Sequence, residues 1–282
     1  MRRVEVKVSR TVVLKLGGEL LEDRARMTAV ARLIARAGKK QRLVVVHGGG
    51  KEIDAALAQA SIPKQQVDGL RITDGPTLQV VVAVLAGSIN TRLVAAVNAA
   101  GGRAVGLTGA DAGVGLVKPA KPHRAASGEL VDLGLVGEPV AVAGAPLLET
   151  LCANGFVPVI ACIGASRDGR LFNVNADTLA ASLAARLGAR RLVIAGGTPG
   201  VLDNLGKTIP KLDTIGIDRL VKSGTATAGM IAKLNATRQA MAGGVEVAIT
   251  DGRRPAGLDA LVNGTAGDNG PWTRLQASTN GR

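Results

Sequence analysis

Apolar runs alternate with amphipathic stretches along most of the chain. "TVVLKLGG" (11–18) and "RLVVVHGGG" (42–50) are β-branched runs that close on glycine, which predicts two strands. The residues after each run place apolar side chains near a 3.6-residue period, so we expect a helix after 18 and another over 51–60. The same alternation predicts helices over 88–102, 147–155, 177–189 and 228–244, and strands over 104–109, 157–164, 190–197 and 245–250.

Strands that alternate with helices through short loops are typical of an α/β protein. We therefore predict a three-layer sandwich, with a central, mostly parallel sheet covered by helices on both faces. Residues 118–138 carry Pro, His, Gly and charges and predict a hairpin-like excursion, and 264–282 turn polar and predict a short strand with a loose tail. The alternation of apolar and charged residues in 1–10 favours a strand over a helix. No linker divides the chain, so one domain is expected.

The composition of the chain narrows the cellular locations that are expected for the protein. The longest candidate for a membrane span that we identify, 139–163, is interrupted by two prolines, Glu149 and Asn154, and no signal peptide is recognised. Cys152 and Cys162 lack metal-ligand spacing and fit small buried residues in a reducing compartment. These features predict a cytoplasmic protein that does not bind membranes.

The chain is strongly basic, with a net charge of +13. Such a charge raises the hypothesis of a nucleic-acid partner. Aromatic residues, however, make up only 1% of the chain, which argues against recognition of single strands by base stacking. A solvated basic face, or attraction of small anionic ligands, is the favoured interpretation, and no nucleic-acid partner is expected.

Two glycine turns follow predicted strands. Ligands of open parallel sheets bind at the carboxyl ends of the strands, where Gly17-Gly18 and Gly48-Gly49-Gly50 would lie. Backbone N–H groups of such turns suit an anion, and a Cβ atom would block its close approach. The spacing matches neither a Walker loop nor G-x-G-x-x-G, so tight packing remains an alternative explanation of the glycines.

Three charged residues favour phosphoryl transfer. Lys15 interrupts an apolar strand, Lys233 lies in the apolar helical run "GMIAKL", and Asp177 ends the polar tract "NVNAD" at a helix start, where it could also be a helix cap. Two cations, glycine amides and one organising carboxylate suit a reaction in which catalysis is mainly positioning and charge neutralisation.

The sequence resembles the amino acid kinase family over roughly residues 11–265. The resemblance rests on an ordered series of motifs: "KLGGELLED", "VVVHGGGKEID", "GLRITD", "LAGSINTRLVAAV", "GLTGADAG", "DLGLVGE", "LFNVNADTLAASLA" and "GMIAKL". It is greatest to the members that phosphorylate the γ-carboxylate of N-acetyl-L-glutamate with ATP, in arginine biosynthesis. It implies the amino acid kinase fold, with an N-terminal lobe (about 11–175) for the amino acid, a C-terminal lobe (about 176–265) for ATP, and a tail (266–282).

The resemblance also implies roles for individual residues. The catalytic residues would be Lys15, Lys233, Asp177, Gly17 and Gly18. The substrate would be held by Gly49, Gly50, Arg71 and Asn173. The nucleotide would be held by Gly197, Thr198, Gly200, Val201, Thr225, Ala226, Thr227 and Gly229. Mg²⁺ would be bound through the nucleotide phosphates, with no protein metal site, and the protein would be a homodimer.

One departure from the family pattern concerns the nucleotide. The family usually has Ser or Thr followed by Asp at the end of the strand over 190–197, whereas this chain has Gly196 and Gly197. Contacts to adenosine would then come from backbone or from nearby threonines. Two other functions stay open: a related carboxylate kinase acting on a carrier-protein-linked amino acid, and a non-catalytic relative that binds polyanions.

Overall fold

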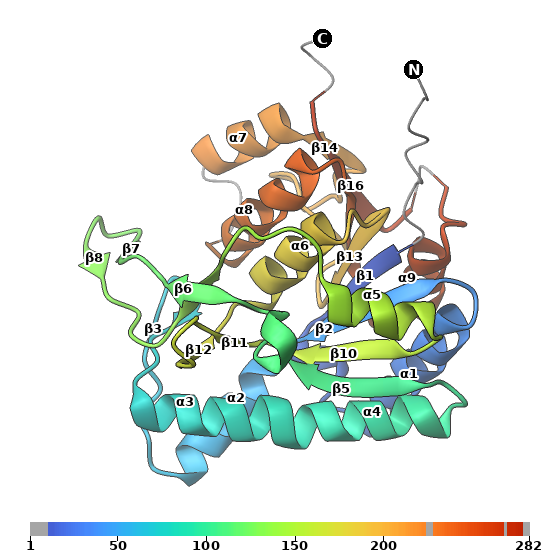
Figure 1. The fold of residues 1–282 in the computed structure, drawn as a ribbon. Helices are drawn as coiled ribbons and strands as arrows, with labels where there is room; N and C mark the ends of the chain where they lie inside the picture. Colours follow the sequence, from blue (N-terminus) through green and yellow to red (C-terminus); the bar gives the residue numbers. More distant parts are fainter. Residues whose placement is uncertain (1–10, 224–227, 268–269, 279–282) are drawn as a thin grey trace, which may run out of the picture.

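The computed structural model describes residues 11–223, 228–267 and 270–278. Its centre is a sheet of eight strands (Figure 1). In spatial order these are β14 (Lys211–Asp213), β16 (Trp272–Gln276), β15 (Glu246–Asp251), β13 (Arg191–Gly196), β1 (Thr11–Leu16), β2 (Arg42–His47), β10 (Val157–Ala161) and β5 (Ala104–Thr108). Only β16 with β15 pairs antiparallel in this sheet. The prediction of a central, mostly parallel sheet is confirmed.

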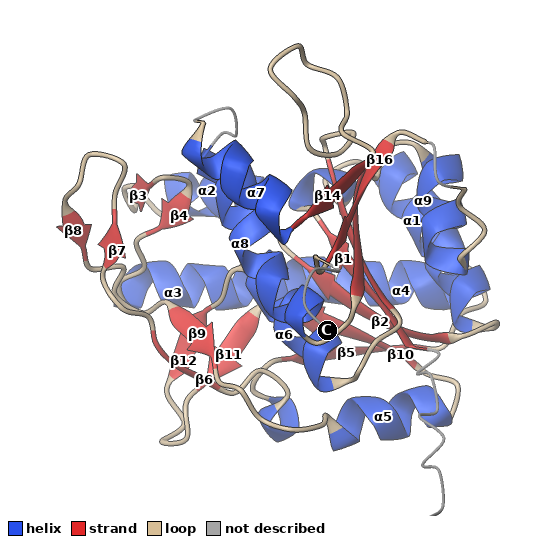
Figure 2. Ribbon diagram, turned by 90° about the horizontal axis from the view of Figure 1, so that it is seen from above, coloured by secondary structure: helices blue, strands red, loops and turns tan. Residues whose placement is uncertain are grey.

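Helices cover both faces of the sheet, as Figures 1 and 2 show. One face carries α1 (Arg24–Gly38), α4 (Asn90–Ala99) and α9 (Pro255–Asn263). The other carries α5 (Pro146–Ala153), α6 (Ala176–Arg186) and α8 (Ala228–Ala242). Burial on both faces explains why the strands read as continuous apolar runs, and β1 is buried at all six positions. The predicted three-layer sandwich is therefore confirmed.

The remaining elements lie around this sandwich. The helical ones are η1 (Gly18–Leu20), α2 (Gly50–Gln59), α3 (Gly75–Val82), η2 (Ala83–Ile89), η3 (Asp111–Gly113) and α7 (Thr214–Lys222). The two-stranded sheets pair β3 (Gln66–Val67) with β4 (Leu70–Arg71), β6 (Val117–Pro119) with β9 (Gly137–Pro139), β7 (His123–Arg124) with β8 (Leu130–Val131), and β11 (Ile163–Ala165) with β12 (Leu171–Asn173). The nested pairs β6–β9 and β7–β8 confirm the hairpin-like excursion over 118–138.

The helix expected over 88–102 begins much earlier. It runs continuously from Gly75 to Ala99, and its middle, η2, is a π-helix. Its start has the signals of a helix N-terminus, because the Asp74 side chain accepts a hydrogen bond from the Thr77 N–H and Pro76 stands in the first turn. The late start predicted from the sequence was wrong.

This helix also corrects the search for membrane spans. Gly75–Ala99 has the length and hydropathy of a span, so 139–163 was not the strongest candidate. Of its most apolar 18-residue window, 39% is buried inside the fold. Val81, Leu85 and Ile89 are fully buried in the hydrophobic core. A core helix passes the same test of length and composition, so the finding is weak evidence for a membrane.

The remaining predictions concern the two ends of the chain and the segment before α8. The strand expected within 1–10 and the nucleotide contacts Thr225, Ala226 and Thr227 lie outside the described residues. The short strand expected near the end of the sequence is β16. It lies inside the main sheet, between β14 and β15.

Candidate active site

The carboxyl ends of the parallel strands all point to the same end of the sheet. The predicted catalytic residues lie together at this end. Lys15 Nζ lies 2.8 Å from Asp177 Oδ1, and Lys233 Nζ lies 3.1 Å from Asp177 Oδ2. The three residues come from β1, α6 and α8, and all three side chains are at most 16% exposed. Each oxygen of one carboxylate thus binds a different ammonium group.

Asp177 can bridge the lysines because it is not the cap of its helix. Asn175 is the N-cap of α6, and its side chain accepts hydrogen bonds from the N–H groups of Asp177 and Thr178. The carboxylate in the first turn is also favoured by the positive end of the helix dipole. The alternative role of Asp177 as a simple helix cap is therefore wrong.

The charges of the three groups are strongly coupled. Burial raises the pKa of Asp177, but the charges of Lys15 and Lys233 outweigh burial and hold it at about 2. Burial alone would lower the pKa of Lys15, but Asp177 raises it above its ordinary value. Burial and the charge of Lys15 lower the pKa of Lys233 despite Asp177. With both lysines protonated the centre carries a net charge of +1 and attracts an anion.

The two glycine turns touch each other beside this centre. A Cβ atom on Gly18 would stand 2.8 Å from the Gly49 Cα atom, so the turns pack backbone against backbone. A Cβ on Gly49 would also meet the side chains of Leu85 and Ile89, which project from the π-helix η2. π-Helical turns are frequent at functional sites. Packing therefore explains the glycines at positions 18 and 49.

Gly50 has a different environment. A Cβ on Gly50 would meet nothing within 4 Å, and its φ is not in the left-handed region. Neither packing nor backbone conformation within the described residues requires glycine at this position. Gly50 is exposed at the first position of α2, where unpaired N–H groups suit an anion.

A buried hydrogen-bonded chain supports the second glycine turn. His47 Nδ1 lies 3.2 Å from the Gly48 carbonyl oxygen, which can only accept, so Nδ1 carries the proton. Asn90 Nδ2 then donates to His47 Nε2 at 3.1 Å and to the Val159 carbonyl oxygen at 2.9 Å. Burial lowers the pKa of His47 to about 4, which keeps the ring neutral as this pattern requires. The sequence analysis assigned no role to His47 or Asn90.

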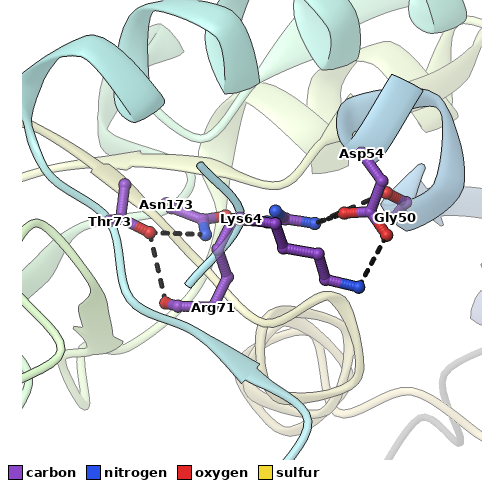
Figure 3. A network of polar contacts seen from close by, with 6 residues as sticks. All are labelled: Gly50, Asp54, Lys64, Arg71, Thr73 and Asn173. Atoms are coloured by element: carbon purple, nitrogen blue, oxygen red, sulfur yellow. Dashed lines mark hydrogen bonds and ion pairs between the residues drawn. The ribbon is translucent and has the colours of Figure 1, made fainter. Parts of the chain in front are cut away.

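Arg71 lies next to the second glycine turn (Figure 3). It forms an ion pair with Asp54, which also binds Lys64 at 2.8 Å. Arg71 Nη2 lies 3.4 Å from the Gly50 carbonyl oxygen, whereas its buried Nη1 has no hydrogen-bond partner among the described residues. A buried guanidinium nitrogen without a partner is suited to a carboxylate ligand.

Asn173 belongs to the same network. Its Nδ2 donates to Thr73 Oγ1 at 3.2 Å, and Thr73 Oγ1 donates to the Arg71 carbonyl oxygen (Figure 3). The structure therefore brings Arg71 and Asn173 together, although 102 positions separate them in sequence. Asp54 was missed by sequence analysis; its position one helical turn after Gly50 could have indicated it.

The residues predicted to hold the nucleotide do not all lie together, unlike the predicted catalytic residues. Gly197 and exposed Thr198 follow β13 at the same end of the sheet, and Gly229 lies exposed at the start of α8. Gly200 and Val201 are buried instead: a Cβ on Gly200 would stand 2.9 Å from the Thr273 nitrogen, and Val201 N–H donates to Thr273 Oγ1 at 2.8 Å. Gly200 also has a φ of 139°, so backbone conformation and packing both require glycine there.

Known proteins resemble this chain over most of its length. The family model described as "Amino acid kinase family" matches residues 10–251. The acetylglutamate kinase of Parvibaculum lavamentivorans is 43% identical over 252 residues, covering 86% of this chain and 82% of that protein. The acetylglutamate kinase of Rhodospirillum centenum is 40% identical over 270 residues, covering 92% and 87%.

Solved structures extend the comparison to the fold. The crystal structure of smu.665 from Streptococcus mutans matches with a TM-score of 0.71 and 27% identity, covering 86% of this chain and 95% of that one. Carbamate kinase from Giardia lamblia bound to AMP-PNP matches with a TM-score of 0.68 and 18% identity, covering 96% and 99%. By its fold, and by a family model that spans most of its length, this chain belongs to the amino acid kinase family.

Proposed function

We propose that this chain phosphorylates the γ-carboxylate of N-acetyl-L-glutamate with ATP, giving N-acetyl-L-glutamyl 5-phosphate, the second step of arginine biosynthesis. The observation that carries the proposal is the contact between the two glycine turns beside the Lys15–Asp177–Lys233 centre. The relatives with 37–43% identity are acetylglutamate kinases, which supports this acceptor.

The geometry suggests a division of the site. Gly49, Gly50, Arg71 and Asn173 lie on the β2 side of the first glycine turn, and Gly197 lies on the β13 side. We propose that the acceptor binds on the β2 side, in the lobe of residues 11–175, and ATP on the β13 side, in the lobe of residues 176–265. Gly17 and Gly18 would then lie where the phosphoryl group passes between them.

The reaction needs charge neutralisation more than covalent help. A γ-carboxylate oxygen attacks the γ-phosphorus, the bond to the β-phosphate oxygen breaks, and ADP leaves. Both reactants are anions, so the +1 charge of the lysine centre lowers the repulsion between them. Asp177 holds both ammonium groups at this point, and Arg71 would fix the α-carboxylate of the acceptor through its unpaired Nη1. Mg²⁺ bound to ATP would neutralise further phosphate charge.

The direct test is ADP release from MgATP, measured in parallel with N-acetylglutamate, glutamate, aspartate and aminoadipate. Hydroxylamine would trap the acyl phosphate. We expect turnover only with N-acetylglutamate, and its loss in Lys15→Ala. Absence of turnover with every free acid would contradict the proposal and favour a carrier-linked acceptor or a binding role.

We also propose a cytoplasmic homodimer. In support, α3 and η2 carry several apolar side chains that are only partly buried, namely Val80, Val82, Val84 and Ala86. Apolar surface of this kind suits contact with a second copy of the chain. Light scattering should give twice the mass of one chain, and a monomer at micromolar concentration would contradict this assembly.

A further inference from the structure

The Glu19 side chain lies between the two halves of the site. It follows the first glycine turn, in η1, and folds back over it, so that its Cδ and Oε1 atoms stand 2.6 Å from the position of a Cβ on Gly17. Its Oε1 also stands 3.1 and 3.6 Å from the positions of Cβ atoms on Gly196 and Gly197. The carboxylate therefore occupies the space that side chains at the end of β13 would fill.

This carboxylate is surrounded by cations without binding any of them directly. Burial lowers the pKa of Lys15 and Asp177 raises it, and the Glu19 charge raises it further. Asp251 raises the pKa of Arg253, and the Glu19 charge adds to this effect. It also opposes the lowering of the Lys233 pKa. Yet within the described residues the Glu19 carboxylate accepts no hydrogen bond and forms no ion pair.

A carboxylate beside a turn that receives phosphate groups has to be explained. Like charges at close range repel, so Glu19 alone would weaken nucleotide binding. A divalent cation between carboxylate and phosphates reverses the sign of the interaction. Mg²⁺ in phosphate-transferring sites is usually held by one or two carboxylates together with substrate phosphates. Residues 11–223, 228–267 and 270–278 contain no group of three or more metal-binding side chains, so phosphate oxygens would have to complete the coordination.

We propose that Glu19 binds the divalent cation of ATP, directly or through a water molecule, so that the nucleotide phosphates do not hold the cation alone, contrary to what the family resemblance implied. The inference rests on the proposed function, because it needs ATP on the β13 side of the first glycine turn. It assigns the cation to the space between Gly17 and Gly196-Gly197, on the side of the turn away from Gly49. Glu19 would thereby supply a carboxylate at a strand end that carries no side chain of its own.

The test compares nucleotide binding with and without the metal. Isothermal titration calorimetry of the wild type and Glu19→Gln would use ATP with Mg²⁺ and ATP with excess EDTA. We expect the variant to bind MgATP about tenfold more weakly. It should bind metal-free ATP equally well or more tightly, because a repelling charge has gone. The proposal would be overturned by a variant that binds metal-free ATP and MgATP more tightly by the same factor. It would also be overturned by a variant that binds both with the affinity of the wild type.

A spectroscopic readout makes the test independent of affinity. Mn²⁺ with ATP and the wild type should give an electron paramagnetic resonance spectrum that differs from that of the Glu19→Gln complex, because one ligand or hydrogen-bonded water has changed. Identical spectra at saturating Mn·ATP would also overturn the proposal. Glu19→Asp, which keeps the charge on a shorter side chain, should retain part of the preference for the metal-bound nucleotide.

Glu22 provides a matched control. It lies three residues further on and its carboxylate binds Lys51 at 3.2 Å, away from β13. Glu22→Gln should leave the ratio of the two ATP affinities unchanged, and a thermal melt of each variant checks folding. A wild type that binds no ATP would sink the proposed function itself. A wild type that phosphorylates N-acetylglutamate, beside a Glu19→Gln variant with unaltered metal preference, would sink only this inference.

Discussion

Two clusters, each with one carboxylate between two cations, lie at opposite ends of the central strands. At the carboxyl ends, Asp177 binds Lys15 and Lys233. At the amino ends, Glu246 lies 2.7 Å from Arg191 Nη2 and 3.6 Å from Arg274 Nη1. The charges are the same in number and sign, but the hydrogen bonding of the two clusters differs.

The arginines use much of their hydrogen-bonding capacity on the main chain. Arg191 Nη1 donates to the Leu261 carbonyl oxygen at 2.6 Å, and Arg274 Nη2 donates to those of Ala266 and Gly267 at 2.6 and 2.9 Å. Each lysine ammonium has three donors, and Asp177 accepts only part of that capacity. The comparison indicates that the arginine cluster joins the strands to α9 and to the loop after it, whereas the lysine cluster keeps donors available for a ligand.

The largest expected effect is on catalysis at the lysine cluster. Lys15→Met removes the charge but keeps most of the side-chain volume, so the fold should persist while ATP-dependent phosphorylation falls by about a thousandfold. Steady-state kinetics on protein shown to be folded by circular dichroism would measure this. A variant with more than a tenth of wild-type turnover would mean that Lys15 does not contact the transferring group.

The matching change at the other cluster should affect stability. Arg191→Met leaves Glu246 without its nearest partner and removes the shorter of two hydrogen bonds to the Leu261 carbonyl oxygen, so the free energy of unfolding should fall by about 3 kcal/mol. Turnover per folded molecule should stay within about twofold of the wild type. Urea unfolding and active-site titration would separate the two quantities, and a large loss of turnover would abolish the distinction between the clusters.

Acid titration sharpens the comparison further. The pKa of Asp177 is depressed to about 2, so its ion pairs contribute stability above its ordinary value near 4, and that contribution is lost as pH falls toward 2. The difference in unfolding free energy between the wild type and Asp177→Asn should therefore shrink by about 2 kcal/mol between pH 5 and pH 2. Urea unfolding at several pH values measures it. A difference that is independent of pH would mean that Asp177 titrates normally.

The smallest expected effect distinguishes glycines needed for packing from those near a ligand. Gly50→Ala adds a methyl group where nothing lies within 4 Å, so unfolding should change by less than about 1 kcal/mol while the KM for the acceptor rises. Gly49→Ala should destabilise the fold by about 1–3 kcal/mol, because its Cβ meets Leu85 and Ile89. An unchanged KM in Gly50→Ala would remove Gly50 from the acceptor site.

The sequence predicted the sheet well and marked Lys15 as a side chain that needs a charged partner, because both follow local rules. Buried parallel strands read as apolar runs, and a lysine inside such a run requires a partner, which the structure provides as Asp177. The start of the long helix was missed because its "VVVAVLA" stretch shows no polar period, and the π-helix shifts the spacing of its buried residues. The helices α7 and α9 were also missed.

Other features depended on contacts that no local pattern encodes. Arg71 is paired with Asp54, and the position of Glu19 against Gly196 depends on the neighbouring strands β1 and β13. The three consecutive glycines looked equivalent in the sequence, but Gly49 is enclosed by side chains of η2 and Gly50 is open. Distinguishing a glycine needed for packing from one near a ligand therefore required the positions of Leu85 and Ile89, 36 and 40 places from Gly49.

The place of β16 in the sheet has a consequence for synthesis of the protein on the ribosome. β14 joins the sheet only through β16, which begins 59 residues after β14 ends. At about 5 to 20 residues per second, a nascent chain would wait about 3 to 12 s with β14 made and its neighbour absent. From the completion of β15 until β16 is made, the outer side of β15 would also be an unpaired edge, open to chaperones or to wrong pairing with another nascent chain.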